Sequence, residues 1–193
     1  IDTLMFFDGV EKEAVDAPWG GRFGLEPPMA KNSLLAAQST SPRICIGNQA
    51  APEIRCFGPD TTRIVIRWQA EAAPIEDVEI TQWRDTIANV FAGKVSESAV
   101  LEMLDQVSVP EVRPYFTRLV LDAVGNLWVE QRSVVWAKPT ETDFLVFDTE
   151  GLLLGTVTLP PIHVLGIGED YVLGIYRDDM DVEYLRLHAL LKP

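Results

Sequence analysis

The sequence predicts an all-β fold built from repeated antiparallel sheets, because one strand pattern recurs along the chain. An apolar stretch, a polar turn and a second apolar stretch occur three times, at 33–47, 118–130 and 163–175. Each copy is typical of a β-hairpin, since turn residues such as Gly125 and Asn126 separate segments rich in Val, Ile, Leu and aromatic residues. A second hairpin follows two of the copies, so the repeating unit has four strands. The strands of this second hairpin are Glu53–Phe57 with Arg63–Trp68, and Asp143–Phe147 with Leu152–Leu159.

The length of the repeat identifies the kind of unit. The equivalent positions Asn126 and Tyr171 are 45 residues apart, whereas Arg43 and Asn126 are 83 residues apart. The excess of 38 residues equals the length of Ala72–Val109, the one stretch that is typical of helices and not of strands. A four-stranded unit of roughly 40 to 50 residues has the blade length of a β-propeller. The sequence therefore predicts propeller blades interrupted by one helical insertion.

The insertion, at about 75–107, is expected to form two short amphipathic helices. In the first helix, apolar side chains recur at spacings of three and four up to Gly93, which can end a helix. These side chains are Ile80, Trp83, Ile87, Val90 and Phe91. Ser96 or Ser98 can cap a second helix of the same kind. We expect the helices to cover an edge or a face of the blades, with a ligand lid as the alternative.

The blades are expected to form a single partial propeller domain over 1–193, as part of a larger propeller. Its parts are a half blade at 1–16, a blade at 33–69, the insertion at 72–109, a blade at 117–160 and a last blade at 163–190. The half blade is a hairpin of Asp2–Phe7 and Val10–Val15. The last blade has only the strands His163–Gly168, Tyr171–Tyr176 and Val182–Leu190, so its outer edge is expected to be open. About three and a half blades then form an arc and not a closed ring.

One segment resembles a known propeller repeat. Within Arg118–Glu130, the run Leu-Val-Leu-Asp-Ala-Val-Gly-Asn-Leu-Trp-Val resembles the Asp-x-x-Gly-Asn-Leu-Trp-Val signature of NHL-like and two-component-regulator-type propeller repeats. Together with 145–157 and 167–184, it makes residues 33–190 similar to the C-terminal part of uncharacterised bacterial six-bladed β-propeller proteins. The resemblance implies the six-bladed fold with a helical insertion between late blades. It assigns no catalytic residue, because the activity of those proteins is largely unassigned.

Composition excludes some classes of partner. The net charge of −13 repels phosphates, whereas proteins that bind nucleic acids usually carry a basic stripe, so no nucleic-acid partner is expected. The apolar runs are only a few residues long, far short of the roughly 20 that a membrane-spanning helix needs. A targeting signal would lie upstream of Ile1, and we lean towards an extracytoplasmic location on the strength of the resemblance.

The two cysteines lie in neighbouring strand-like segments. If these segments form a hairpin centred on Ala50 and Ala51, Cys45 faces Cys56 across the two strands. A disulfide and two buried free thiols are both compatible with that pairing. No Cys-x-x-Cys or Cys/His cluster accompanies them, so a zinc site is not expected.

Few residues suggest a reaction. His163 and His188 are the only histidines, and no catalytic triad, zinc-protease motif or phosphate loop accompanies them. Gly166-Ile-Gly168 is interpreted as a hairpin turn, because the residues after it continue as a strand and do not open a dinucleotide-binding helix. No catalytic, cofactor-binding or metal-binding residue is therefore assigned, and no cofactor is expected.

Two further groups of residues have both a structural and a functional interpretation. Asp178, Asp179, Asp181 and Glu183 have the two-residue spacing of calcium loops but lack the turn Gly and distant Glu of an EF-hand, so a solvated acidic loop is favoured over a calcium site. Aromatic residues at repeated strand positions usually fill the space between blades, and a sugar-binding shelf is the alternative for Trp19. The tryptophans are Trp19, Trp68, Trp83, Trp128 and Trp136.

Two functions follow from these observations. The first is a non-enzymatic binding or scaffold module, with an unknown small molecule or protein bound by loops around the propeller channel. The alternative is a metal-dependent propeller hydrolase of lactonase type. Asp122 and Asn126 are its candidate ligands, and the remaining ligands would come from further blades.

Overall fold

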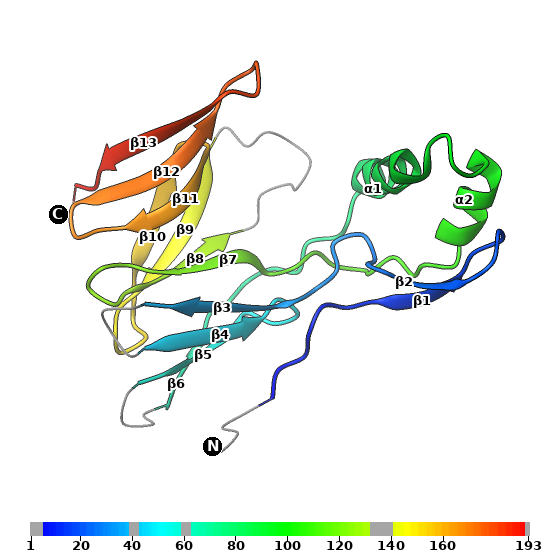
Figure 1. Ribbon diagram of the computed structural model, residues 1–193. Coiled ribbons are helices and arrows are strands. Elements are labelled where there is room, and N and C mark those ends of the chain that lie inside the picture. The colour runs from blue at the N-terminus through cyan, green and yellow to red at the C-terminus, as the bar shows by residue number, and fades with distance from the viewer. Residues whose placement is uncertain (1–5, 39–42, 59–62, 132–140, 192–193) are drawn as a thin grey trace. The chain divides into compact units, whose positions relative to one another are not determined.

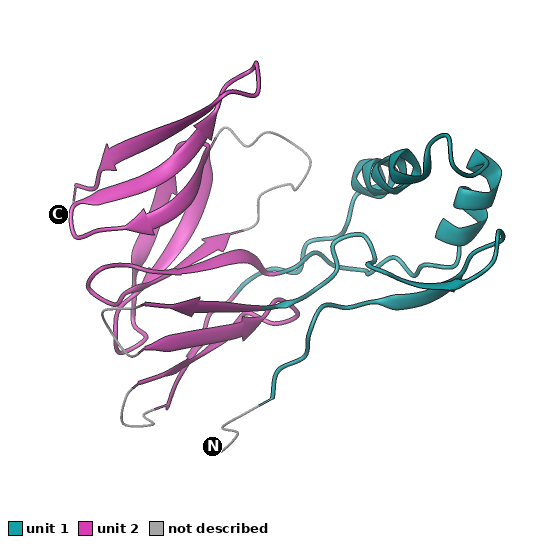
Figure 2. Cartoon of the chain, in the orientation of Figure 1, with its two compact units in different colours: residues 1–33, 70–114 teal, residues 34–69, 115–193 magenta. Residues whose placement is uncertain are grey.

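The computed structural model describes residues 6–38, 43–58, 63–131 and 141–191. The fold is mostly β, with antiparallel sheets and two helices, as the sequence predicts (Figure 1). The chain packs as two compact units (Figure 2): residues 1–33 with 70–114, and residues 34–69 with 115–193. The prediction of one domain over 1–193 stays a prediction.

The described residues of the second unit form three sheets, each made of strands that follow one another in sequence. Sheet 1 consists of β3 (Ser33–Ala37), β4 (Ile44–Asn48), β5 (Glu53–Phe57) and β6 (Arg63–Arg67). Sheet 2 consists of β7 (Phe116–Leu121), β8 (Leu127–Gln131), β9 (Thr142–Phe147) and β10 (Leu153–Leu159). Sheet 3 consists of β11 (Ile162–Ile167), β12 (Tyr171–Arg177) and β13 (Glu183–Ala189). These sheets confirm the two predicted four-stranded units, and among the described residues the last unit has three strands, with β13 at its edge.

Sheets 1 and 2 share one hydrophobic core, and sheets 2 and 3 share another. Strand side chains alternate between faces, so sheet 2 presents Leu127 and Val129 to the first core and Trp128 to the second. Trp68 packs against Phe116 and Phe147 in the first core, with ring centroids 5.9 Å from each. Trp68 and Trp128 thus fill the space between sheets, as predicted, while Trp136 lies outside the described residues.

The same aspartate turn recurs three times in the second unit. In each turn, one carboxylate oxygen accepts hydrogen bonds from the backbone amides two and four residues further on, as in an Asx turn. The three are Asp122 with Val124 and Asn126 (3.1 and 2.8 Å), Asp148 with Glu150 and Leu152 (2.9 and 2.8 Å), and Asp178 with Met180 and Val182 (2.9 and 3.0 Å). The residue three positions after each aspartate has a positive φ. It is a glycine in two of the turns, Gly125 and Gly151, and it is Asp181, with φ 65°, in the third.

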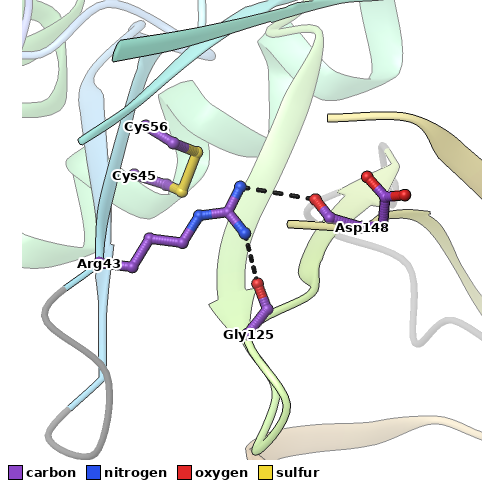
Figure 3. The surroundings of a disulfide bond; sticks show 5 residues. All are labelled: Arg43, Cys45, Cys56, Gly125 and Asp148. Carbon is purple, nitrogen blue, oxygen red and sulfur yellow. Dashed lines mark hydrogen bonds between the residues drawn. A yellow bond between two sulfur atoms is a disulfide. The ribbon is translucent and has the colours of Figure 1, made fainter. Parts of the chain in front are cut away.

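A disulfide joins β4 to β5 in the predicted register (Figure 3). Cys45 pairs with Cys56 across the two strands, with their Cα atoms 4.0 Å apart and both side chains buried. Of the two alternatives that the sequence left open, the structure has the disulfide.

Arg43, just before β4, links sheet 1 to the turns of sheet 2 (Figure 3). Its Nη1 donates to the carbonyl oxygen of Gly125 at 2.6 Å, and its Nη2 to that of Asp148 at 3.5 Å. Burial lowers the pKa of this guanidinium, while the nearby carboxylates of Asp148 and Asp122 oppose that effect. The aspartate turns therefore also receive a buried cation from the neighbouring sheet.

The first unit combines the helices with a short hairpin. β1 (Glu13–Asp16) pairs with β2 (Arg22–Leu25), and α1 (Asp77–Phe91) and α2 (Glu97–Leu104) pack their apolar side chains with it in one core. The two predicted helices are confirmed, and the Ser96 side chain caps α2 by accepting from the amide of Ala99. Trp83 lies in this core.

The predicted N-terminal hairpin is wrong in its pairing. Glu13–Asp16 pairs with the strand that follows it in sequence, and residues 6–12 belong to no strand. The rest of the predicted first strand, residues 2–5, lies outside the described residues. The physical reason is the turn at 17–21, where Gly20 and Gly21 have φ near 100° and allow the chain to reverse after β1.

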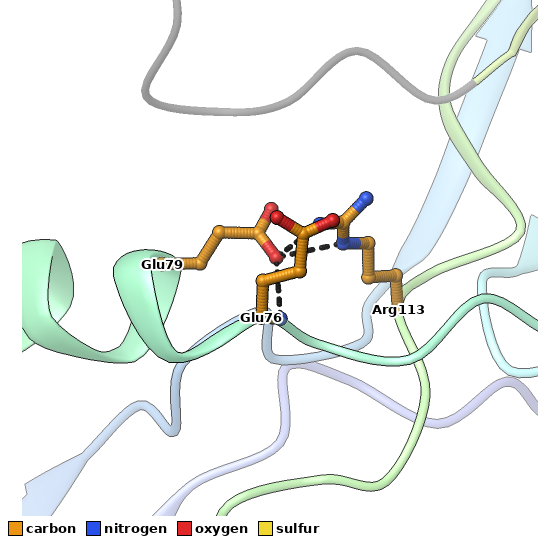
Figure 4. Close-up of polar contacts among 3 residues, drawn as sticks. All are labelled: Glu76, Glu79 and Arg113. Carbon is orange, nitrogen blue, oxygen red and sulfur yellow. Dashed lines mark hydrogen bonds and ion pairs between the residues drawn. The ribbon is translucent and has the colours of Figure 1, made fainter.

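A buried ion pair fixes the start of α1 (Figure 4). Glu79 accepts from the backbone amide of Glu76 at 2.9 Å, completing a capping box, and from Nε of Arg113 at 2.8 Å. Both side chains of the pair are at most 4% exposed. Arg113 also lies 3.3 Å from the Glu76 carboxylate. The pair thus ties the helix to the segment that leaves the first unit.

Candidate functional site

A pocket of about 860 Å³ lies in the second unit, where the ends of sheets 2 and 3 meet. It is lined by the starts of β7, β9 and β11, the ends of β8 and β12, and the loop between β12 and β13. Ile162 and Ile175 supply apolar wall, and the charged side chains in the lining include Arg118, Glu130 and Glu183. A hollow with apolar walls and a few convergent polar groups is the usual form of a ligand site.

Arg118 is the central polar residue of this pocket. Its Nη1 donates to the carbonyl oxygen of Val164 at 2.9 Å, and its Nη2 lies 2.6 Å from Nδ1 of His163. Its Nε lies 3.5 Å from the carboxylate of Glu130, its cross-strand partner on β8. The Arg118 and Glu130 side chains are 26% and 15% exposed, so both are partly withdrawn from water.

The position of Arg118 sets the charge of His163. A guanidinium group can only donate hydrogen bonds, so Nδ1 of His163 has to accept, which requires the neutral imidazole. Partial burial, followed by the Arg118 charge, lowers the pKa of His163, while Glu183 opposes the shift. Burial also raises the pKa of Glu130, against the opposing effects of Arg118 and Thr117. An acid and a base shifted in opposite directions in one pocket are typical of functional sites.

The loop after β12 forms the acidic side of the pocket. Asp178 organises it, because its second carboxylate oxygen accepts from the Tyr184 hydroxyl at 3.1 Å in addition to the turn contacts. Arg177 pairs with Glu183 and lies 3.7 Å from the carboxylate of Asp181. Of the predicted acidic loop, Asp178 is therefore held by the turn, and Asp181 and Glu183 are held by Arg177. Among the described residues, no three His, Cys, Asp or Glu side chains converge as ligands of a metal ion would.

The other candidates lie elsewhere. His188 is on β13, paired across the strands with Val172 on the face towards sheet 2. Gly166 and Gly168 belong to the β11–β12 hairpin, which confirms the turn interpretation. Trp19 is in the first unit, with its ring centroid 5.4 Å from that of Phe91.

The two residues considered as hydrolase metal ligands are engaged inside a turn. Asp122 is fully buried, and its second carboxylate oxygen accepts from Asn126 Nδ2 at 2.9 Å and from Trp128 Nε1 at 3.1 Å. Because its other oxygen already accepts two backbone amides, all four lone-pair positions of this carboxylate are used. These contacts explain the Asp-x-x-Gly-Asn-Leu-Trp run as a structural unit.

Sequence reasoning missed the Arg118–Glu130–His163 cluster, although one signal pointed to it. Arg118 and His163 are 45 residues apart, one repeat period, and each begins a copy of the repeated hairpin. Equivalent positions of consecutive copies lie close together when the copies stack, so polar residues at those positions are candidates for one site.

Comparisons with known protein families, with curated proteins and with solved structures found no match for this chain. No helix among the described residues is long and apolar enough to cross a membrane.

Proposed function

We propose that sheets 1, 2 and 3 are consecutive blades of a larger β-propeller that serves as a non-enzymatic binding module. The packing of first strands supports the arrangement: the Ala123 amide, just after β7, donates to the Ile167 carbonyl of β11 at 2.9 Å, and Arg118 donates to Val164. First strands that lie side by side are expected where blades radiate from a central channel. The resemblance to NHL-like and six-bladed propeller proteins is part of the same proposal.

The pocket beside Arg118 is the proposed binding site. It lies where the connection into β11 and the loop between β12 and β13 come together, at one end of two blades. Its volume suits a small molecule or the side chain of a protein partner. The single observation that carries this proposal is the Arg118–His163 contact, because it joins equivalent positions of two blades in one pocket.

The charge of the pocket favours a ligand with a positive group. Among the described residues, its lining has four carboxylates against two arginines, and His163 is neutral when it accepts from Arg118. The carboxylates are Glu130, Asp179, Asp181 and Glu183, and the arginines are Arg118 and Arg177. A net negative pocket with isoleucine walls fits an ammonium or guanidinium group on an apolar body.

Isothermal titration with agmatine tests this function, because agmatine carries both positive groups on a short apolar chain. We expect saturable binding of agmatine and none of N-butylurea, a neutral analogue. Glu183→Gln should weaken agmatine binding at least about tenfold, since it removes a charged acceptor worth roughly 1.5–3 kcal/mol and leaves Arg177 to repel the ligand. Glu169→Gln is the matched control, because Glu169 is an exposed carboxylate outside the pocket lining. Equal binding of both probes, or no saturable heat, would overturn the proposal.

The contacts of Asp122 and Asn126 supply no support for the hydrolase alternative. The Asp122 carboxylate is fully used by the backbone amides of the turn, by Asn126 Nδ2 and by Trp128 Nε1, so it cannot bind a metal ion without losing these contacts.

A further inference from the structure

One face of sheet 3 carries exposed leucines and is left uncovered by the other described residues of the second unit. Its opposite face, with Val164 and Val172, is buried in the core shared with sheet 2. On the uncovered face, Leu165, Leu185 and Leu187 are 50%, 72% and 68% exposed. We call this the outward face of sheet 3, defined by Leu165, Leu173, Leu185 and Leu187. Adjacent exposed leucines of this kind mark a surface that binds another protein surface.

The repeat shows what covers such a face. Each of the four leucines has an equivalent residue in sheet 2. For Leu165 and Leu173 the equivalent lies 45 residues earlier in the sequence, which is one repeat period. For Leu185 and Leu187, on β13, the equivalent is the residue of β9 that occupies the same cross-strand position. The equivalents are Val120 for Leu165, Trp128 for Leu173, Phe144 for Leu185 and Val146 for Leu187. All four equivalents pack in the core that sheet 3 covers. The residues on the outward face of sheet 3 therefore occupy the positions that, in sheet 2, pack against the following sheet.

Sheet 1 presents the complementary kind of face. Leu127 and Val129 of sheet 2 are fully buried against the preceding sheet, and Val172 of sheet 3 is buried against sheet 2 in the same way. Their equivalents in sheet 1 are Ile44 and Ile46, which pair with Phe57 and Arg55 on the face away from sheet 2. Ile44 is 42% exposed. We call this the outward face of sheet 1, defined by Ile44, Ile46 and Val65.

We infer that the outward face of sheet 3 binds the outward face of sheet 1 in a second copy of this chain. The contact would continue the sheet-on-sheet packing already made twice within the chain. It uses two different surfaces, so it is head to tail, and two copies can close on each other through two such contacts. The inference rests on the blade arrangement proposed above, with the second copy supplying the neighbouring blades of the larger propeller, and the contact needs no ligand in the pocket beside Arg118.

Charge favours the same pairing. The outward face of sheet 1 carries Arg55, Arg63 and Arg67 against Glu53, which pairs with two of them. The loop at the end of sheet 3 carries three aspartates and Glu183 follows it, against Arg177. Opposite net charges on two such surfaces steer them together and disfavour pairing of either face with itself.

Sedimentation velocity of the 193-residue chain tests this inference. We expect the mass to rise from 21.5 kDa to at least twice that value as the concentration increases. Leu187→Asp and Ile44→Asp should each abolish the association, because each places a charge in one of the two contacting faces. Both positions are exposed in the single chain, so circular dichroism of each variant should match that of the wild type. Leu154→Asp is the matched control, since Leu154 is 61% exposed but belongs to neither face.

Mixing the two variants identifies the geometry. The Ile44→Asp variant retains the outward face of sheet 3, and the Leu187→Asp variant retains the outward face of sheet 1, so their mixture should form a complex that neither forms alone. A wild-type chain that stays at 21.5 kDa at every concentration overturns the inference. So does association that survives Leu187→Asp, or a mixture that stays monomeric. Loss of agmatine binding with association intact would reject only the pocket.

Discussion

Two arginine–glutamate pairs show how the same residues can serve either the fold or a site. Glu79 and Arg113, in the first unit, are almost completely buried, and the Glu79 carboxylate also caps a helix. Arg118 and Glu130, in the second unit, line a pocket, and Arg118 reaches on to His163. The first pair is enclosed by its own unit, whereas the second remains open to a ligand. The role of an arginine–glutamate pair is therefore decided by how deeply the pair is buried and by its other contacts, and not by the residue types.

The largest effect is expected from Arg113→Met. The substitution leaves Glu79 as a buried carboxylate without its cation, which typically costs about 3–5 kcal/mol in the free energy of unfolding. Denaturant unfolding followed by helical circular dichroism reports this change, since α1 and α2 both lie in the first unit. The double variant Glu79→Gln with Arg113→Met keeps the capping contact without the charge and should recover most of the loss. A loss below about 1 kcal/mol in the single variant would contradict the structural role.

The disulfide is the covalent counterpart of that ion pair in the second unit. Replacing Cys45 and Cys56 by alanine should lower the free energy of unfolding by about 3 kcal/mol, the usual value for a short closed loop. Urea unfolding followed by tryptophan fluorescence measures it, because Trp68 packs in the core that the disulfide adjoins. Alkylation of the unfolded, unreduced protein is the control. Reaction of two free thiols there would show that the disulfide does not form.

Arg118, in the pair that lines the pocket, is expected to affect mainly the protonation of His163. Arg118→Met removes a positive charge beside His163, so the pKa of His163 should rise towards the usual 6.5. In the wild type the unfolded chain binds this proton more readily than the folded chain, so His163 lowers stability as the pH falls below 6.5. NMR titration of the imidazole protons measures the shift, with His188→Asn to assign the signals. An unchanged titration would show that Arg118 does not control His163.

The smallest effect is expected from Glu130→Gln. Burial raises the pKa of Glu130, so the folded chain takes up this proton more readily than the unfolded chain, and this group favours folding as the pH falls through its pKa. Glutamine removes that pH dependence and should change stability at neutral pH by less than about 1 kcal/mol. Unfolding measured at several acidic pH values checks both points. A loss as large as that of Arg113→Met would end the contrast between the two pairs.

Local pattern predicted much of the second unit. The spacing of Cys45 and Cys56 about Ala50 and Ala51 determined the hairpin register, because a two-residue period leaves little freedom once one face is buried. The Asp-x-x-Gly run at Asp122 likewise indicated a turn whose mechanism the structure shows.

The first unit was harder to predict because its contacts are distant in sequence. The Glu79–Arg113 pair spans 34 residues, and neither residue belongs to a motif. The β1–β2 hairpin was missed because apolar residues near Ile1 matched the strand pattern more strongly than the short segment at Arg22–Leu25. In the candidate site, Arg118 and Glu130 are cross-strand partners and so could be paired from the hairpin, but their contact with His163 depends on how two sheets stack.

The order of strands has a consequence for how the chain folds during synthesis. Each strand of sheets 1, 2 and 3 is hydrogen-bonded to the strand next to it in sequence. Contacts between neighbours in sequence close small loops, and they form faster than pairings of distant segments. Each sheet can therefore assemble as it emerges from the ribosome, before the sheet after it has been translated, and the helical insertion gives sheet 1 additional time before β7 appears.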